Sequence, residues 1–384
     1  MDKIKLEEYC VNKINSIPNK GDFAIDYIDI SSVDNSSKKI LGYNTYEISE
    51  APSRAKQLLE LGDVLVSTVR PNLNAVALCD IFADNILVGS TGFCVLRGND
   101  KVNNKYLYYF CQSKYFVGEL IKVATGASYP AVSKNDITNI LIPNIKIEHQ
   151  NQIVKILDAV KKIINNRKEQ LELLDELVKS RFVELFGDPI ENPMSWEMKQ
   201  VDDVCSSIYG GGTPSKKYPE YFDGEIPWVT PKDMKSLIIR DSIDHITEEA
   251  INNSSAKLAP PNSVLMVIRS GILKHTLPVA INKVPVTVNQ DMKIFVPNKH
   301  STSYFLTFLF KMIEQDVLSG VRSVTADNID FSVFRKRLIP IPPIELQNIF
   351  VEFVLHTDKL KTGVQKSLEE TQVLFDSLMK EYFD

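Results

Sequence analysis

The stretch LIPNIKIEHQN at residues 141–151 is nearly repeated as LIPIPPIELQN at residues 338–348. The same offset of 197 residues, without a gap, also aligns further pairs, among them Val154 with Val351, Leu171 with Leu368, and Phe186 with Phe383. Nearer the start of each half, KLEEYC (5–10) is similar to QVDDVC (200–205). Self-similarity at a fixed offset is the mark of an internal repeat, so the chain is predicted to be a tandem duplication.

Each repeated stretch is predicted to open a long helix, because it places a glutamate shortly after a proline, and both residues favour a helix start. Apolar residues then recur at alternating spacings of four and three, which is the pattern of a coiled-coil seam. In the first helix the seam positions are Ile153, Leu157, Val160, Ile164, Arg167, Leu171, Leu174, Val178, Arg181 and Leu185. In the second they are Phe350, Val354, Thr357, Lys361, Val364, Leu368, Thr371, Phe375, Leu378 and Tyr382. A helix of about 39 residues spans about 58 Å, and two such helices most simply pack on each other.

The segments outside the long helices mix short strands with helices. Runs rich in β-branched and aromatic residues predict strands, at residues 64–69, 93–97, 264–268, 285–288 and 292–296. One helix is predicted in each half, at residues 105–124 and 303–319, and each is expected to end at a glycine (Gly126 and Gly320). The predicted fold class is therefore α+β: two globular domains of tandem-duplicated origin, separated by two long antiparallel helices that form a coiled coil. The expected segments are 1–146 (first globule), 147–188 (first helix), 189–343 (second globule) and 344–384 (second helix).

Composition points to an ordinary globular protein, since 24% of the 384 residues are charged and the net charge is −5. The five cysteines form no CxxC pair and the five histidines are scattered, which argues against a disulfide framework and against a zinc site. No signal peptide is recognisable, and no apolar run reaches the roughly 18–20 residues that a membrane span needs. A cytoplasmic location is expected.

The stretch GGGTPSKK at residues 210–217 looks at first like a phosphate-binding loop. A P-loop needs glycine directly before Lys-Ser/Thr, so that successive backbone N–H groups surround the phosphates. Here Pro214 and Ser215 precede Lys216, and proline has no N–H. GxGxxG, GxSxG and HExxH are also absent. The sequence therefore predicts no catalytic group, no metal and no cofactor.

The second half nevertheless carries a specific signature. GGGTPSKKYPEYFDG (210–224) followed by EIPWVTPKDM (225–234) resembles the recognition domains of specificity subunits of type I restriction-modification enzymes. The paired LIP…E-x-Q-N helix openings and FGDP (186–189) are also similar to that family. The resemblance covers nearly the whole chain. It is weaker in the first globule, which has only YIDISSVD (27–34) at the equivalent place.

The resemblance implies a subunit that catalyses nothing itself. Each globule would be a target-recognition domain that reads one half of a split duplex DNA site, and the helices would fix the distance between the halves. The helices would also dock two methylation subunits, and restriction subunits would complete the complex. Because the globules differ in sequence, the site is expected to be bipartite and asymmetric. The second helical segment carries four basic and eight acidic residues, which suits protein partners better than phosphates.

Candidate DNA contacts are chosen on the principle that base edges need donors and acceptors in fixed geometry, whereas phosphates need only charge. In the second globule the candidates are Thr213, Ser215, Lys216, Lys217, Lys232, Arg269, Lys274 and Arg322. In the first they are Arg70, Asn72, Asn74, Ser128, Tyr129 and Lys134. Arg70 and Arg269 occupy the same strand-to-loop place in the two halves, and the loops of Tyr129 and Arg322 are also equivalent. Trp228 is expected in the core.

Plainer interpretations remain open. The loop at 210–217 could be a solvated turn, and Lys38, Lys39 and Arg54 could be surface charge. The whole chain could be a coiled-coil adaptor without sequence-specific DNA binding, or its β-rich globules could hold an enzyme that no motif reveals.

Overall fold

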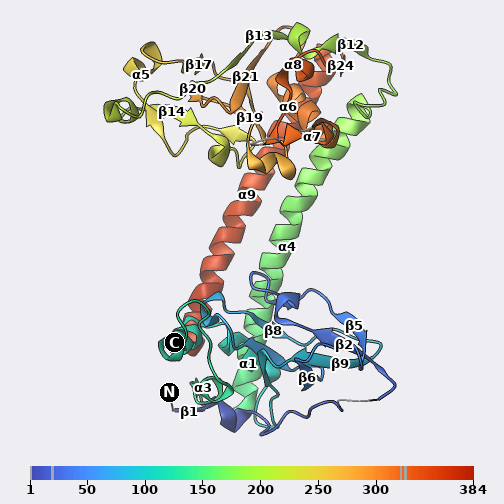
Figure 1. Ribbon diagram of the computed structural model, residues 1–384, viewed down its shortest axis with the longest axis vertical. Coiled ribbons are helices and arrows are strands. Elements are labelled where there is room, and N and C mark those ends of the chain that lie inside the picture. Colours follow the sequence, from blue (N-terminus) through green and yellow to red (C-terminus); the bar gives the residue numbers. More distant parts are fainter. Residues whose placement is uncertain (1, 19–20, 321, 324–326) are drawn as a thin grey trace. The chain divides into compact units, whose positions relative to one another are not determined.

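The computed structural model describes residues 2–18, 21–320, 322–323 and 327–384 (Figure 1). The chain divides into two compact units. Unit 1 comprises Met1–Lys168 and Gln365–Asp384, and unit 2 comprises Glu169–Val364. Each unit therefore contains one globule and part of each long helix. Within the described ranges, no helix is both long enough and apolar enough to cross a membrane.

The globule of unit 1 contains a four-stranded sheet and a three-stranded sheet. In the four-stranded sheet the order is β5 (Asn44–Glu47), β2 (Ala24–Ile28), β9 (Ile86–Ser90) and β6 (Ala55–Leu58). β2 and β9 run parallel, and the other two pairs are antiparallel. The three-stranded sheet is antiparallel, in the order β10 (Phe93–Leu96), β7 (Val64–Ser67) and β8 (Val76–Leu78). Short pairs join β3 (Val33–Asp34) to β4 (Lys39–Ile40), and β1 (Lys3–Lys5) to β11 (Leu141–Pro143).

Unit 2 repeats this topology with other residues. The order β16 (His245–Ile246), β14 (Ile226–Val229), β20 (Val286–Val288) and β17 (Leu258–Ala259) again has one parallel pair, β14 with β20. The second sheet contains β21 (Met292–Pro297), β18 (Val264–Val267) and β19 (Val279–Asn282), with β13 (Cys205–Gly210) and β15 (Ile238–Ile239) added at its edges. β12 (Glu197–Gln200) pairs with β24 (Leu338–Ile341) as β1 pairs with β11. The duplication expected from the sequence is thus present in the strand order.

The long helices are α4 (Ile147–Phe186) and α9 (Ile344–Phe383). In unit 1, Leu157 of α4 shares a hydrophobic cluster with Met379 of α9. In unit 2, the ring centroids of Phe182 of α4 and Phe350 of α9 lie 5.5 Å apart. The first part of α4 therefore packs with the last part of α9, and the last part of α4 with the first part of α9. This is the predicted antiparallel coiled coil.

The predicted seam positions are all buried or half-buried in both helices. Several buried side chains lie beside the seam, however, and the heptad pattern alone did not identify them. These are Val154, Phe182, Phe186, Met379 and Phe383. Phe383 packs against Tyr106 with ring centroids 5.2 Å apart, and Phe186 packs against Phe305 at 5.0 Å. Each helix thus buries a second stripe against a globule.

The prediction of one helix at residues 105–124 and one at 303–319 was wrong in detail. Unit 1 has α1 (Asn104–Phe110) and α2 (Lys114–Val123), because the Ser113 hydroxyl accepts a hydrogen bond from Phe116 N (3.1 Å) and starts a new helix. α2 also ends before Gly126, which lies in the following loop with a φ of +103°. Unit 2 has α6 (Ser303–Met312) and α7 (Glu314–Ser319), and here Gly320 does follow the helix end. The remaining short helices are α3 (Lys134–Thr138), α5 (Glu248–Asn252) and α8 (Phe331–Phe334).

A glutamine fixes the start of each long helix to its own globule. The Gln150 side chain is fully buried; its Nε2 donates to Lys101 O (3.1 Å) and Ile145 O (2.9 Å), and its Oε1 accepts from Asn103 N (2.9 Å). Gln347 makes the same set in unit 2, donating to His300 O (2.9 Å) and Pro342 O (3.0 Å) and accepting from Thr302 N (2.8 Å). The glutamine of the repeated E-x-Q-N stretch is therefore a buried connector, not a surface residue.

The five cysteines are buried free thiols. Burial raises the pKa of Cys10, Cys79, Cys94 and Cys205 to about 12 and also raises the pKa of Cys111. They serve as small apolar side chains of the core.

Candidate nucleic-acid interface

In unit 1 the two loops predicted to contact DNA lie against each other. Arg70 N donates to Pro130 O (2.7 Å), and Val69 forms an isolated bridge with Ala131. The guanidinium carbon of Arg70 lies 4.5 Å from the centroid of the Tyr129 ring. Tyr129 is 67% exposed, and Ser128 beside it is also exposed. The arrangement offers a stacked arginine and tyrosine at the surface, and both side chains suit contacts with bases.

The backbone of the loop at residues 70–74 turns sharply, since Arg70 (φ +50°) and Asn74 (φ +47°) both adopt the left-handed conformation. Between them, Asn72 is exposed. Asn74 is engaged within the protein: its Nδ2 donates to Gln112 O (3.4 Å), and its carbonyl oxygen accepts from Lys38 Nζ. Of the two asparagines, Asn72 is the more exposed.

An apolar hollow of about 690 Å³ lies beside this loop. Its walls include Ile30, Val33 and Leu73, and Arg54 and Arg70 also line it. Apolar surface next to guanidinium groups matches the edge of an A·T or G·C pair, which presents either a thymine methyl group or acceptor atoms. Sequence reasoning missed the hollow because its walls come from separate parts of the chain.

Unit 2 brings together the equivalent loops. Ser270 N donates to Asp327 O (3.1 Å), and Lys274 Nζ lies 4.0 Å from the Asp327 carboxylate. Arg322 pairs with Asn328 through the backbone of β22 (Arg322–Ser323) and β23 (Asp327–Asn328). The side chain of Arg322 lies outside the described part of the structure.

Arg269 is oriented differently from Arg70. Its Nε donates to Asp291 Oδ1 (2.7 Å), while Asn289 Nδ2 donates to the other oxygen of the same carboxylate (3.1 Å). The arginine side chain remains 49% exposed. The guanidinium of Arg269 is therefore held by a carboxylate, whereas the guanidinium of Arg70 is held by an aromatic ring.

Close packing explains two of the three glycines at 210–212, Gly211 and Gly212. A Cβ on Gly211 would lie 1.8 Å from Val288 O, and one on Gly212 would lie 2.2 Å from Ser255 Oγ. Gly212 O also accepts from Trp228 Nε1 (3.0 Å), and Trp228 is buried as expected. The glycines let this loop pass close to the end of β20.

After the glycines, Thr213 is half-buried and Pro214 is buried, and the last three residues of the 210–217 stretch face outward. Ser215, Lys216 and Lys217 are exposed, and the Thr213 hydroxyl donates to Gln290. Because Gln290 precedes Asp291, the turn between β20 and β21 contacts both the Thr213 loop and Arg269. Sequence reasoning missed this turn, since Asn-Gln-Asp between two strands reads as an ordinary loop.

Two predicted lysines stand apart from these loop contacts. Lys232 forms an ion pair with Asp244 (2.8 Å), whose hydrogen bond raises the lysine's pKa. Lys134 is exposed in the first turn of α3, and no hydrogen bond or ion pair links it to Arg70 or Tyr129 in the described ranges. Among the residues that the structure describes, no group of three His, Cys, Asp or Glu side chains is arranged to hold a metal ion.

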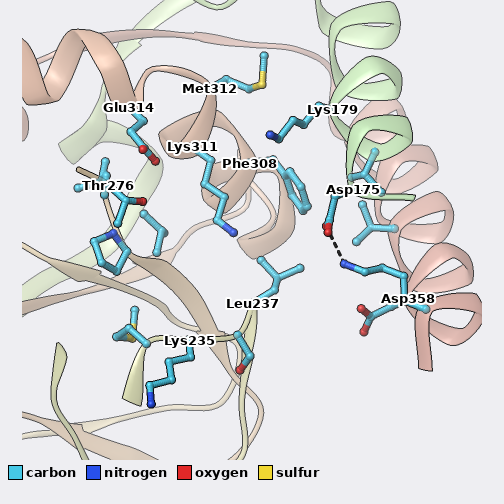
Figure 2. Close-up of a pocket in the computed structure, with 18 of the residues that line it drawn as sticks. Asp175, Lys179, Lys235, Leu237, Thr276, Phe308, Lys311, Met312, Glu314 and Asp358 are labelled. Carbon is cyan, nitrogen blue, oxygen red and sulfur yellow. Dashed lines mark hydrogen bonds and ion pairs between the residues drawn. The ribbon is translucent and has the colours of Figure 1, made fainter. Parts of the chain in front are cut away.

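Unit 2 also has a cleft of about 690 Å³ between its globule and the long helices (Figure 2). Acidic and basic side chains line it in similar number: Asp175, Glu314, Asp358, Lys179, Lys235, Lys311 and Lys361. Asp175 of α4 pairs with Lys361 of α9 (2.6 Å), which the dashed line marks. Burial lowers the pKa of Lys311, whose side chain crosses the cleft from α6.

Comparison with known proteins gives consistent similarities. A family model described as "Type I restriction modification DNA specificity domain" matches residues 9–173 and, a second time, residues 193–370. The chain is 33% identical to the EcoR124I/EcoR124II specificity subunit of Escherichia coli, over 59% of this chain but only 56% of that protein. It is 24% identical to the MjaIX specificity subunit of Methanocaldococcus jannaschii, over 83% of this chain and 76% of the relative.

Solved structures show the same fold. A chain from a type I restriction-modification system superposes with a TM-score of 0.64 at 23% identity, covering 99% of this chain and 97% of the other. The S subunit of such a system from M. genitalium gives a TM-score of 0.60 at 14% identity, covering 100% and 96%.

Proposed function

Because the chain belongs to the family of type I restriction-modification specificity subunits, we propose that it recognises a split, asymmetric sequence in duplex DNA. One globule would read each half-site. The observation that carries the proposal is the paired loop arrangement: in both units an exposed arginine, Arg70 or Arg269, follows a central strand and meets a second loop. Arginine is the side chain that most often reads guanine, through two parallel hydrogen bonds.

The different supports of the two arginines favour an asymmetric site. Tyr129 holds Arg70 by its ring, and Asp291 holds Arg269 by its carboxylate. In unit 1, Asn72 and Ser128 would add polar contacts. In unit 2, Thr213, Ser215, Lys216 and Lys217 would contact the duplex from the loop beside Gln290, with Lys274 and Arg322 on the facing loops and Lys232 and Lys134 as outer phosphate contacts.

We further propose that the chain acts without catalysis of its own. Its segments would be two target-recognition domains, 1–146 and 189–343, and two spacer helices, 147–188 and 344–384. The helices would set the separation of the half-sites and dock methylation and restriction subunits. DNA recognition and subunit docking would take place in the cytoplasm.

The experiment begins with the recognised sequence, which is found by mapping methylated sites in the host genome with and without this chain. The full chain, purified with the methylation subunits of its system, is then tested for binding to that duplex and to duplexes changed at one base pair. Arg70→Ala is expected to relax discrimination at one base pair of one half-site, by about 1–3 kcal/mol. Arg269→Ala should do the same in the other half-site only.

A complex that binds all duplexes alike would leave the chain as an adaptor and end the proposal. Nucleotide turnover by the isolated chain that disappears in Lys216→Ala would point instead to an enzyme.

A further inference from the structure

Unit 1 has its own cleft between globule and helices, with a volume of about 380 Å³. The globule contributes the β3–β4 turn and the junction of α1 with α2, and the helices contribute residues of α4 and α9. Six lysines line it, and they define what we call the lysine cleft: Lys38, Lys39, Lys114, Lys161, Lys168 and Lys380.

The lysine cleft has a large excess of positive charge. Its two carboxylates, Asp376 and Asp384, accept hydrogen bonds from Gln372 Nε2 (3.0 Å) and Tyr115 N (3.1 Å). In the described ranges of the chain, no carboxylate lies within ion-pair distance of any of the six lysines. Positive charge gathered in a concave site attracts anions more strongly than the same charge on a convex surface.

Lys161 is the innermost of these lysines. Its side chain is half-buried, its Nζ donates to Tyr108 Oη (2.8 Å), and it lies 4.8 Å from the centre of the Tyr108 ring. Burial, together with the charges of Lys39 and Lys38, lowers the pKa of Lys161 to about 8. The nearest opposing charge, Asp158, is already bound to Lys105 (2.6 Å) and Tyr109 Oη (2.7 Å). A bound anion would relieve the repulsion among these ammonium groups.

Hydrogen bonds connect the lysine cleft to the loop at residues 70–74. Tyr108 Oη, which accepts from Lys161, donates to Lys38 O (3.0 Å). Lys38 in turn donates from its Nζ to Asn74 O. The cleft is therefore linked by three hydrogen bonds to the loop that carries Arg70.

The equivalent cleft of unit 2 lacks this charge. By the offset of 197, Lys161 corresponds to Asp358, and the uncharged Gln372 corresponds to Asp175. Asp175 of α4 neutralises Lys361 of α9 on the helical wall of that cleft (Figure 2). The excess of lysine is thus a property of one unit, and it does not follow from the repeated architecture.

We propose that the lysine cleft binds phosphate groups of the DNA segment that separates the two half-sites, next to the bases read by the loop at residues 70–74. The inference rests on the proposed function, since it assumes that this loop meets a duplex. Phosphate suits the site because lysine offers a point charge without base preference. The segment between the half-sites is favoured over the outer flank because α4 and α9, which form one wall, lead along the chain to unit 2.

The test uses the full chain in complex with its methylation subunits and measures the affinity for duplex DNA over a range of salt concentrations. The variant Lys39→Gln with Lys168→Gln changes two exposed side chains, so folding should be unaffected. Log affinity falls with log salt, and each lost phosphate contact makes that slope shallower by about 0.9. The double variant should therefore reduce the magnitude of the slope by about 2. The loss should be equal for the recognised duplex and for random duplexes. Lys39→Arg with Lys168→Arg should keep the original slope.

A matched control lies in unit 2, where Lys179→Gln with Lys361→Gln removes the same charge from the other cleft and should change the slope little. Neutral methylphosphonate linkages between the half-sites should weaken binding by the unaltered chain, and should have little further effect on the Gln double variant.

An unchanged slope in the Lys39/Lys168 variant would overturn the inference, as would methylphosphonates that act only in the outer flank. Weaker assembly with the methylation subunits at an unchanged slope would show that the cleft binds a protein instead. These outcomes are separable from failure of the proposed function, which would appear as loss of sequence preference in the unaltered complex.

Discussion

Arg70 and Arg269 show how two copies of one fold can diverge at a single residue. Both arginines follow a central strand and remain exposed, but Tyr129 supports one and Asp291 the other. An aromatic face leaves the five N–H donors of the guanidinium free, whereas a carboxylate occupies some of them and fixes the rest. Arg70 therefore has more donors for a ligand, and Arg269 has fewer donors in a more rigid arrangement.

Gln150 permits a stability prediction at the same scale. Gln150→Leu keeps a side chain of similar size but removes the partner of Asn103 N–H and of Lys101 O, whereas Ile145 O keeps its bond from Tyr9 Oη. Unsatisfied buried polar groups cost about 1–3 kcal/mol, so the free energy of unfolding of unit 1 should fall by that amount. Hydrogen exchange of unit 1 amides in a urea series measures it.

The neighbouring Asn151 supplies the control, because its side chain is exposed and accepts a surface hydrogen bond from Asn103 Nδ2 (2.7 Å). Asn151→Ala should change the stability by less than about 0.5 kcal/mol. Equal effects of the two substitutions would contradict a connecting role for Gln150.

Among the elements, the glycine stretch after β13 gives a sharp test. Gly211→Ala would place a Cβ 1.8 Å from Val288 O, so the backbone has to move. Overpacking of this kind lowers the free energy of unfolding by about 1–3 kcal/mol. Thermal unfolding, with hydrogen exchange to localise the loss to unit 2, measures the change. Gly271→Ala is the matched variant, because its Cβ would meet nothing within 4 Å. If Gly211→Ala proved as harmless as Gly271→Ala, close packing would not explain the glycines.

The elements also show what the sequence could and could not predict. The strands β7 and β18 were predictable because each is a continuous run of β-branched and aliphatic residues, and the long helices because their heptads extend over many turns. The break at Ser113 was hidden, since the apolar pattern continues across it and only the side-chain cap reveals it. The parallel pairing of β2 with β9 depends on contacts between distant segments, on which local periodicity carries no information.

The candidate interface divides in the same way. Residue type and the repeat identified Arg70 and Tyr129 separately, but their contact joins residues almost sixty positions apart. Asn74 stays a predicted contact, and only the structure shows that its side chain also donates to Gln112 O. The lysine cleft was invisible because its six lysines come from separate elements, and the acidic composition of the second helical segment hid their convergence.

At the scale of the whole molecule, the repeated topology predicts that the globules are independent readers. Replacing residues 191–340 by the corresponding segment of another family member should change one half of the recognised sequence and leave the other half unaltered. The reason is that each globule has its own sheets, its own paired loops and its own glutamine connector. Methylated-site mapping in cells that carry the chimera measures the outcome. A change in both halves would contradict the assignment of one globule to one half-site.

The distribution of cysteine supplies the molecule with internal reporters. Cys10, Cys79, Cys94 and Cys111 lie in unit 1 and Cys205 lies in unit 2, and every thiol is buried with a raised pKa. A thiol reagent reacts with the thiolate, so modification has to wait until the surrounding core opens. The rate at which a thiol reagent labels Cys205 therefore reports the opening of unit 2, and the rate for the other four cysteines reports the opening of unit 1. Both rates are measured on the unaltered chain, without any engineered probe.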